Sequence, residues 1–238
     1  MMEQKYKRVL IKLSGEALGE NGRLFDFDQI DRVAAVIREV HEMQAEIAIV
    51  IGAGNIWRGR QGPAAKMGAV TADHMGMLGT MINSLAMQDA LERQGIQTRL
   101  QTAIEMTRFA EPYTYRRAMR HLEKGRVVLF ACGTGNPFFS TDTAAALRAV
   151  EIGADAILLA KNIDGVYDDD PRQNPEAKLL KDITYAEAQQ RGLRVMDAAA
   201  ITICMENKVP AIRVFGLDDP ENILRVMQGD GMGTLVHP

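Results

Sequence analysis

The chain has 238 residues and carries 28 Lys plus Arg against 31 Asp plus Glu, a formal net charge of −3 at pH 7. Hydrophobic residues make up 47% of it and only 8 residues are proline, which excludes a disordered or low-complexity protein. The length fits one large domain or two small ones. No basic stripe accompanies this near-neutral balance, so we expect no nucleic-acid partner.

The ends and the cysteines give no sign of a membrane or an oxidising compartment. Only Val9, Leu10 and Ile11 follow the charged opening before Lys12, too few for the apolar part of a secretory signal. No apolar stretch approaches the roughly 20 residues that a membrane-spanning helix needs. The two cysteines lie far apart and form no metal-binding motif. We therefore expect a cytoplasmic protein with no membrane partner.

Short apolar runs alternate with segments of helical spacing along the chain. The runs at 9–13, 47–51, 98–103, 126–131, 156–160, 211–215 and 234–236 predict buried strands. Apolar residues spaced by three and four predict helices around 30–40, 78–85 and 115–122. This alternation predicts an α/β fold: a three-layer α/β/α sandwich around a mostly parallel sheet. Ligands of such a fold bind at the carboxyl ends of the strands.

Three local signals predict helix starts. Thr184 and Glu187 have the spacing of a capping box. Asp219 precedes Pro220, as a cap precedes a proline in the first turn. The pair at 141–142, Thr-Asp, opens an alanine-rich run that predicts a further helix.

The first predicted strand ends in Lys12, Leu13, Ser14 and Gly15. A lysine within a Val/Ile/Leu strand is costly to desolvate unless it faces an anion at the end of the strand. The Ser-Gly pair provides a turn whose backbone N–H groups can approach phosphate oxygens. This segment predicts a phosphate contact; the alternative is a lysine that extends to solvent at a sheet edge.

The second predicted strand is followed by Gly52, Ala53 and Gly54, and then by Arg58. The glycines permit a close backbone approach, and the arginine can hold phosphate through two parallel hydrogen bonds. A dinucleotide-binding motif is excluded because its third glycine would fall on Trp57. The segment predicts an anion clamp.

The strand expected at 126–131 leads into a polar segment, residues 133–142, and then into the alanine-rich helix. Hydroxyl and amide side chains in this segment offer hydrogen bonds, and the N-terminus of the helix attracts an anion. Asp142 has two interpretations. It is either the N-cap of the helix or a group that organises a transferring phosphate and its cations.

The strand expected at 156–160 leads into a loop that contains Lys161, Asn162, Tyr167 and the carboxylates of 168–170. A lysine, an aromatic ring and carboxylates could together neutralise phosphate, pack against a base and contact ribose or the waters of a magnesium ion. The alternative is a solvated acidic loop.

Familiar catalytic motifs are absent from the sequence. It contains no Walker A motif, no protein-kinase His-Arg-Asp or Asp-Phe-Gly, and no Gly-x-Ser-x-Gly elbow. These absences argue against ordinary NTPases, protein kinases and serine hydrolases.

Taken in order, these segments resemble the amino acid kinase family, and within it the branch that phosphorylates UMP. The segments that carry the resemblance are Lys-Leu-Ser-Gly-Glu at 12–16, Gly-x-Gly-Asn-x-x-Arg-Gly at 52–59, Asp-His-Met-Gly-Met at 73–77, Gly-Thr-Gly-Asn-Pro-Phe-Phe at 133–139, Asp-Gly-Val-Tyr at 164–167, Arg-Val-Met-Asp at 194–197 and Gly-Thr-Leu-Val at 233–236. The resemblance spans nearly the whole chain. It implies a single domain over 1–238, with UMP and the phosphate loops in about 1–150 and ATP in 151–238.

The resemblance implies an enzyme that transfers the γ-phosphoryl group of ATP, carried with Mg²⁺, to UMP. The products would be UDP and ADP, in pyrimidine nucleotide biosynthesis. It further implies a homo-oligomer, a hexamer in this branch, with GTP as an activator and UTP as an inhibitor.

The resemblance also assigns residues to roles. ATP would be bound by Lys12, Leu13, Ser14, Gly15, Gly54, Arg58, Lys161, Asn162, Tyr167 and Asp170. UMP would be bound by Ala53, Asp73, Thr134, Gly135, Asn136, Pro137, Phe138, Phe139, Ser140 and Thr141. The catalytic group would be Lys12, Arg58, Asp142, Lys161 and Asp197, in which the two aspartates orient lysines and magnesium. No metal ion would be bound by the protein directly.

Two positions depart from the family pattern. Ala53 stands where the family often has a third glycine, and residues 19–28 lack the Gly-Phe-Gly-like pattern associated with GTP activation in some relatives. Two other functions remain open: an ATP-binding storage or regulatory protein on the same fold, and a kinase of the glutamate or carbamate type.

Overall fold

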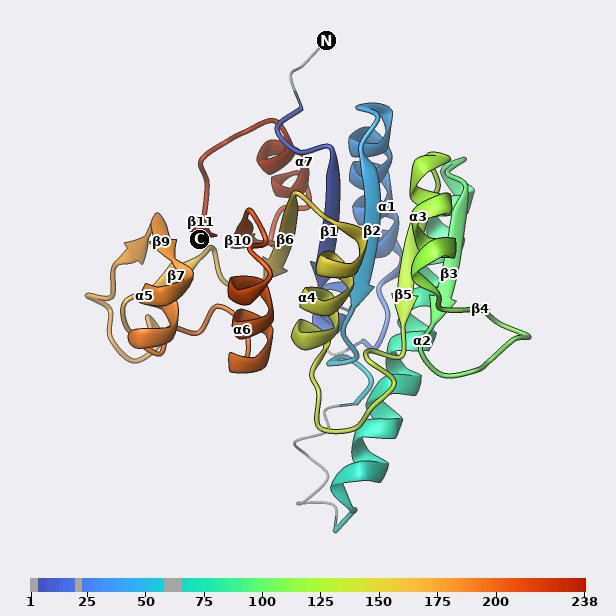
Figure 1. The fold of residues 1–238 in the computed structure, drawn as a ribbon, viewed down its shortest axis with the longest axis horizontal. Coiled ribbons are helices and arrows are strands. Elements are labelled where there is room, and N and C mark those ends of the chain that lie inside the picture. The colour runs from blue at the N-terminus through green and yellow to red at the C-terminus, as the bar shows by residue number, and fades with distance from the viewer. Residues whose placement is uncertain (1–3, 20–22, 58–65) are drawn as a thin grey trace.

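A nine-stranded sheet runs through the molecule (Figure 1). The computed structural model of the chain describes residues 4–19, 23–57 and 66–238. In spatial order the strands are β4 (Glu111–Pro112), β3 (Thr98–Thr102), β5 (Val127–Ala131), β2 (Glu46–Ile51), β1 (Arg8–Leu13), β6 (Ala156–Lys161), β10 (Ile212–Gly216), β11 (Thr234–His237) and β9 (Asp182–Thr184). The strands from β4 to β10 are parallel, and β11 pairs with β10 in the antiparallel sense. The predicted mostly parallel sheet is confirmed.

Helices cover both faces of the sheet and complete the three layers. The helices are α1 (Phe27–Glu42), α2 (Ala69–Arg93), α3 (Tyr115–Glu123), α4 (Thr141–Ile152), α5 (Tyr185–Gln190), α6 (Ala198–Glu206) and α7 (Asn222–Met227), with a short 3-10 helix η1 at Gly15–Leu18. One core lies between the sheet and α1, α2 and α7, and a second lies between the sheet and α3 to α6.

Strand β1 shows how the alternation of side chains builds these two cores. Val9, Ile11 and Leu13 point to the α1 side, whereas Leu10 points to the α4 side. Lys12 has the same parity as Leu10 and therefore points toward α4. A charged side chain thus occupies an otherwise apolar face at the carboxyl end of the central strand.

All seven predicted strands are present, with ends within one residue of those expected. A separate hairpin of β7 (Val166–Tyr167) and β8 (Leu179–Leu180), together with β4 and β9, was not predicted. Elements of two or three residues are too short to show a period in the sequence.

The helix starts were predicted in part. The capping box at Thr184 and Glu187 is confirmed, because each side chain bonds the backbone N–H of the other. The expectation for Asp219 is wrong in position: its carboxylate accepts the N–H of Glu221, but α7 begins only at Asn222. The cap of α4 is Ser140, so Asp142 is not the N-cap.

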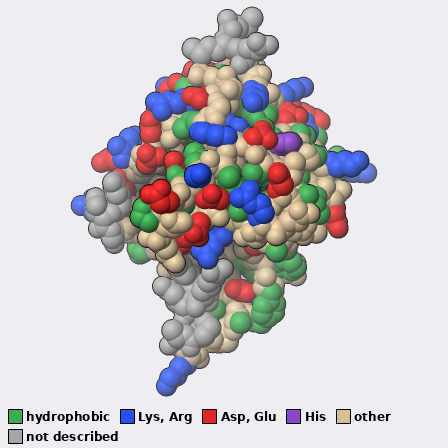
Figure 2. Space-filling model, turned by 90° about the vertical axis from the view of Figure 1, so that its left-hand side faces the viewer, with side chains coloured by type: hydrophobic (Ala, Val, Ile, Leu, Met, Phe, Trp, Pro, Cys, Tyr) green, Lys and Arg blue, Asp and Glu red, His purple; other side chains and the backbone are tan. Residues whose placement is uncertain are grey.

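Helix α2 extends beyond the rest of the molecule at the lower edge in Figure 1. Its exposed side includes Leu78, Ile82 and Leu85, which are 47%, 48% and 37% exposed. Figure 2 shows positive and negative side chains mixed over one face of the molecule, with hydrophobic side chains gathered on its narrow lower part. Within the described ranges, no helix is both long and apolar enough to span a membrane.

Candidate active site

The four loops singled out in the sequence lie at one edge of the sheet. Strands β5, β2, β1 and β6 are consecutive neighbours, and in the register Leu13 pairs with both Ile51 and Ala160. Their carboxyl ends point to the lower edge of the view in Figure 1. The loops that follow them therefore begin side by side, at the edge where open α/β sheets bind ligands.

Lys12 forms an ion pair with Asp142 at this edge. Its Nζ lies 2.7 Å from Oδ1 of Asp142, and the lysine is only 8% exposed. Asp142 is placed there because Ser140 caps α4 by accepting the N–H groups of residues 142 and 143. The lysine is therefore not a solvent-extended side chain at a sheet edge. It is a buried cation held by one carboxylate at the N-terminus of a helix.

Lys161, the last residue of β6, lies close to the same pair. It donates a hydrogen bond to the carbonyl oxygen of Val195. Burial lowers the pKa of the Lys161 ammonium; the Asp142 carboxylate partly offsets this effect, and nearby Lys12 adds to it. Two lysines thus lie near one carboxylate, which leaves an excess of positive charge that suits phosphate oxygens.

Asp197 contacts the N-terminal end of α4. Its carboxylate accepts hydrogen bonds from the hydroxyls of Ser140 and Thr143, and from the N–H of Ala200 in the first turn of α6. Burial acts to raise its pKa, but these hydrogen bonds outweigh burial and lower it. Of the two aspartates expected to orient lysines, the structure assigns that contact to Asp142. Asp197 fixes the N-terminus of α4.

The glycine-containing turns after β1 and β2 pack tightly on each other. A Cβ atom on Gly15 would lie 2.6 Å from Gly52 O, from Gly54 N and from Asn55 Oδ1. A Cβ atom on Gly52 would lie 3.3 Å from Gly15 N and 3.5 Å from Thr141 Oγ1. The turns after β1 and β2 and the start of α4 therefore meet closely at a point where only glycine fits.

Asn83 of α2, which was not predicted from the sequence, supports these turns by hydrogen bonds. It is fully buried in α2, and its Nδ2 donates to Gly52 O at 2.7 Å and to Asn55 Oδ1 at 2.8 Å. Asn55 in turn donates to the carbonyl oxygen of Leu24. Asn83 is an amide among the mostly apolar and small buried residues of α2, and this is the signal that could have identified it.

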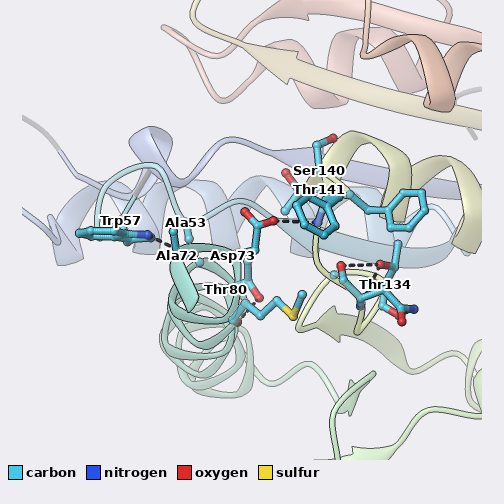
Figure 3. A pocket seen from close by; sticks show the side chains of 14 residues that line it. Ala53, Trp57, Ala72, Asp73, Thr80, Thr134, Ser140 and Thr141 are labelled. Carbon is cyan, nitrogen blue, oxygen red and sulfur yellow. Dashed lines mark hydrogen bonds between the residues drawn. The ribbon is translucent and has the colours of Figure 1, made fainter. Parts of the chain in front are cut away.

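A cavity of about 320 Å³ opens next to this group, between α2 and the loop after β5 (Figure 3). It is lined by Ala53, Trp57, Ala72, Asp73, Gly76, Met77, Thr80, Gly133, Thr134, Asn136, Phe138, Phe139, Ser140 and Thr141. Asp73 from α2 faces the loop across the cavity, and its Oδ2 accepts the N–H of Phe138 at 2.7 Å. The volume is within the range of small-ligand pockets.

Eight of the ten residues assigned to UMP by resemblance, Ala53 among them, line this cavity. Gly135 and Pro137 belong to the same loop but are not among its lining residues. Ala53 packs closely on α2: a Cβ atom added to Gly79 of this helix would lie 2.9 Å from the Cβ of Ala53. Trp57, Met77 and Thr80 also line the cavity and were not predicted, because only the folding of α2 over the loop brings them there.

The residues assigned to ATP are placed more widely. Asn162 donates to the Glu16 carboxylate at 2.7 Å, which joins the loops after β6 and β1. Tyr167 lies on the β7–β8 hairpin, with its hydroxyl on Asp164, and Asp170 lies 3.7 Å from Arg194. The side chain of Leu13 is buried in the core, so only its backbone could reach a ligand. Arg58 lies outside the described residues.

In the described part of the chain, no group of three or more His, Cys, Asp or Glu residues is placed to hold a metal ion. The carboxylates at the site are engaged with protein groups, Asp142 with Lys12 and Asp197 with two hydroxyls.

Solved structures resemble the whole of this chain. A UMP kinase from Bacillus anthracis is 38% identical with a TM-score of 0.93, covering 98% of this chain and 96% of that one. A UMP kinase from Ureaplasma parvum is 36% identical with a TM-score of 0.92, covering 98% and 100%. A uridylate kinase from Archaeoglobus fulgidus is 26% identical with a TM-score of 0.75, covering 96% and 99%.

The resemblance found in the sequence is thereby confirmed at the level of fold and family. The sequence model of the amino acid kinase family matches residues 7–215 of this chain. The chain belongs to the amino acid kinase family.

Proposed function

We propose that this chain is a UMP kinase, which transfers the γ-phosphoryl group of ATP to UMP. The observation that carries the proposal is the group formed by Lys12, Asp142 and Lys161 beside a cavity lined by Asp73 and the loop at 133–141. The cavity supplies an acceptor site, and the two lysines supply positive charge at its end. The similar UMP kinase structures support the same activity.

The reaction needs no general base. An oxygen of the UMP phosphate attacks the γ-phosphorus of ATP, and the bond from that phosphorus to the β-γ bridging oxygen breaks, so that UDP forms and ADP leaves. Phosphoryl transfer through a loose transition state is accelerated mainly by alignment and by fixed charge. Lys12 and Lys161 provide that charge, and the positive end of the α4 helix dipole adds to it.

The binding roles proposed here are those implied by the resemblance, and the placement of the described loops supports them. The turn at Ser14 and Gly15, with Gly54 and Arg58, serves the ATP phosphates, and Lys161 and Asn162 lead to the adenosine contacts of Tyr167 and Asp170. UMP occupies the cavity, with Asp73 at the ribose or phosphate and residues 134–141 around the rest. Asp142 orients Lys12, and Asp197 holds the N-terminal end of α4 by its hydrogen bonds to Ser140 and Thr143.

Mg²⁺ enters this scheme with ATP. Magnesium is usually bound by substrate phosphates, waters and one or two carboxylates, and not by an all-protein cage. Asp142 and Asp197 are carboxylates at the start of α4 and α6 that fit this requirement through water, and a bound ion would neutralise phosphate charge.

Assembly, regulation and location stay predictions. The apolar side chains Leu78, Ile82 and Leu85 exposed along α2 support a homo-oligomer, for which the resemblance implies a hexamer. Activation by GTP, inhibition by UTP, a cytoplasmic location and a place in pyrimidine nucleotide biosynthesis come from the resemblance alone.

An acceptor panel tests the proposed activity. The protein is incubated with ATP and Mg²⁺ and with UMP, CMP, AMP, glutamate or carbamate, and ADP release is followed. We expect fast release with UMP. Release with glutamate or carbamate but not with UMP would favour an amino acid or carbamate kinase, and ATP binding without transfer to any acceptor would favour a storage or regulatory protein.

A further inference from the structure

One buried hydroxyl connects both strands of the β7–β8 hairpin to the main sheet. Thr234, the first residue of β11, is fully buried, and its Oγ1 accepts the N–H of Val166 in β7 at 2.8 Å. The same hydroxyl donates to the carbonyl oxygen of Leu180 in β8 at 2.5 Å. A hydroxyl has one donor, so its proton is committed to Leu180 while it accepts from Val166.

The surrounding backbone is shaped to allow this approach. A Cβ atom on Gly165 would lie 2.8 Å from Thr234 Oγ1, so only glycine lets the hairpin come this close. Gly233 has φ of +68°, and a Cβ atom there would lie 2.0 Å from Val214 O and 3.1 Å from Asp164 O. The loop at 164–166 therefore packs closely against the start of β11, and the hydrogen bonds of Thr234 hold it there.

This hairpin bears on the donor side of the site. It begins five residues after Lys161, at the carboxyl end of β6, and it carries Tyr167, whose hydroxyl bonds Asp164. At the start of the loop after β6, Asn162 donates a hydrogen bond to the Glu16 carboxylate, which lies after β1. The loop between Lys161 and Tyr167 is thus held at its start by the sheet and at its end by Thr234.

We propose that Thr234 is a positioning residue for the ATP site, which sets the β7–β8 hairpin so that residues 164–167 meet the nucleoside part of ATP. The inference rests on the proposed function, because it takes this loop as the adenosine contact. Thr234 touches no substrate itself. Val166 is only 3% exposed, so loss of the Thr234 hydroxyl would leave its N–H without this partner. The loop could then move away from the position that ATP requires.

The test compares Thr234→Val with Thr234→Ser. Valine keeps the shape but removes both hydrogen bonds, and serine keeps the hydroxyl. We expect Thr234→Val to raise the KM for ATP by about tenfold, as expected when a buried N–H loses its partner, while the KM for UMP stays unchanged. Thr234→Ser should restore the KM for ATP. Thr98→Val is the matched control, since Thr98 is 1% exposed and also makes two side-chain hydrogen bonds, but lies at the start of β3.

Two outcomes would overturn the inference: an unchanged KM for ATP in Thr234→Val, or an equal rise for both substrates. Calorimetric titration of ATP into wild type and variant separates the inference from the proposed function. If wild type binds ATP but transfers nothing to UMP, the proposed function fails, while weaker ATP binding by Thr234→Val still supports the role of Thr234.

A measurement on the wild-type protein covers the case in which Thr234→Val does not fold. Amide hydrogen exchange across 164–168 should slow on addition of ATP and stay the same on addition of UMP. Equal exchange with and without ATP would contradict the inference.

Discussion

The Nζ of Lys12 lies 2.7 Å from a carboxylate oxygen of Asp142. This nearly buried ion pair joins the carboxyl end of β1 to the first turn of α4. Breaking such a pair by removing one partner leaves an unpaired charge. The pair also links the two substrate regions, because Lys12 precedes the phosphate turn and α4 follows the acceptor-side loop.

Replacement of Lys12 by alanine should leave a folded protein with much lower turnover. Loss of one preorganised charge at a transition state costs about 10²- to 10³-fold in rate, and we expect kcat to fall at least that much. Steady-state kinetics and circular dichroism check the two parts. Lys124→Ala, at the exposed C-terminal end of α3, is the control and should behave like wild type. Near-normal turnover of Lys12→Ala would remove Lys12 from the mechanism.

Replacement of Asp73 by alanine should affect UMP much more than ATP. Its carboxylate faces the cavity and holds the N–H of Phe138 at 2.7 Å. Removal loses both a contact to UMP and the support of the loop, so the KM for UMP should rise by about tenfold or more, which corresponds to one or two lost hydrogen bonds to a charged group. Asp89→Ala on the same helix, where Asp89 pairs with Arg93, is the control. A larger change in the KM for ATP than for UMP would contradict the placement of UMP.

Replacement of Gly15 by alanine should damage the phosphate turns by steric conflict alone. The new Cβ would lie 2.6 Å from backbone atoms of Gly52 and Gly54, which cannot move without opening the turn. Overpacking of this kind costs about 1–3 kcal/mol, seen as a lower free energy of unfolding, and ATP affinity should fall with it. Gly231→Ala, where a Cβ meets nothing within 4 Å, should be neutral. Full ATP affinity in Gly15→Ala would show that the turn does not approach the phosphates.

The pH dependence should report Lys161. Burial lowers the pKa of its ammonium below the ordinary lysine value, so the charge is lost at a lower pH than for an exposed lysine. We expect kcat/KM for ATP, which reports the free enzyme, to decline on the alkaline side as Lys161 becomes neutral. Lys161→Arg keeps its charge and should move this decline to higher pH.

The same shift fixes the sign of the effect on stability. Between the lowered pKa of the folded protein and the ordinary pKa of the unfolded chain, the unfolded state binds more protons, so the free energy of unfolding rises with pH across that interval. Urea unfolding of wild type and Lys161→Met at several alkaline pH values measures it. If kcat/KM for ATP depended on pH in the same way in wild type and Lys161→Arg, the assignment of the alkaline decline to Lys161 would be contradicted.

Features with a local cause could be predicted from the sequence. Strands β1, β2, β5 and β6 are apolar runs in the sequence, and the sheet brings the loops that follow them to one edge. A lysine inside such a run indicated an anion site because burial of an unpaired charge is costly.

Features with a long-range cause could not be predicted. Whether Ser140 or Asp142 caps α4 depends on where the chain turns, since both residue types cap helices well. Asn83 and Thr234 were missed as supports because their partners lie about 30 and about 60 residues away, and only the packed structure shows them. The contacts of Asp197 likewise required the position of α6 beside α4.

A crystal structure with UMP and a non-hydrolysable ATP analogue would show whether two nucleotides meet end to end at this edge of the sheet. We expect UMP in the cavity of Asp73 and Thr134, with its phosphate and the γ-phosphate of the analogue both in contact with Lys12. Nucleotides bound on separate surfaces, or a γ-phosphate remote from Lys12 and Lys161, would contradict this expectation.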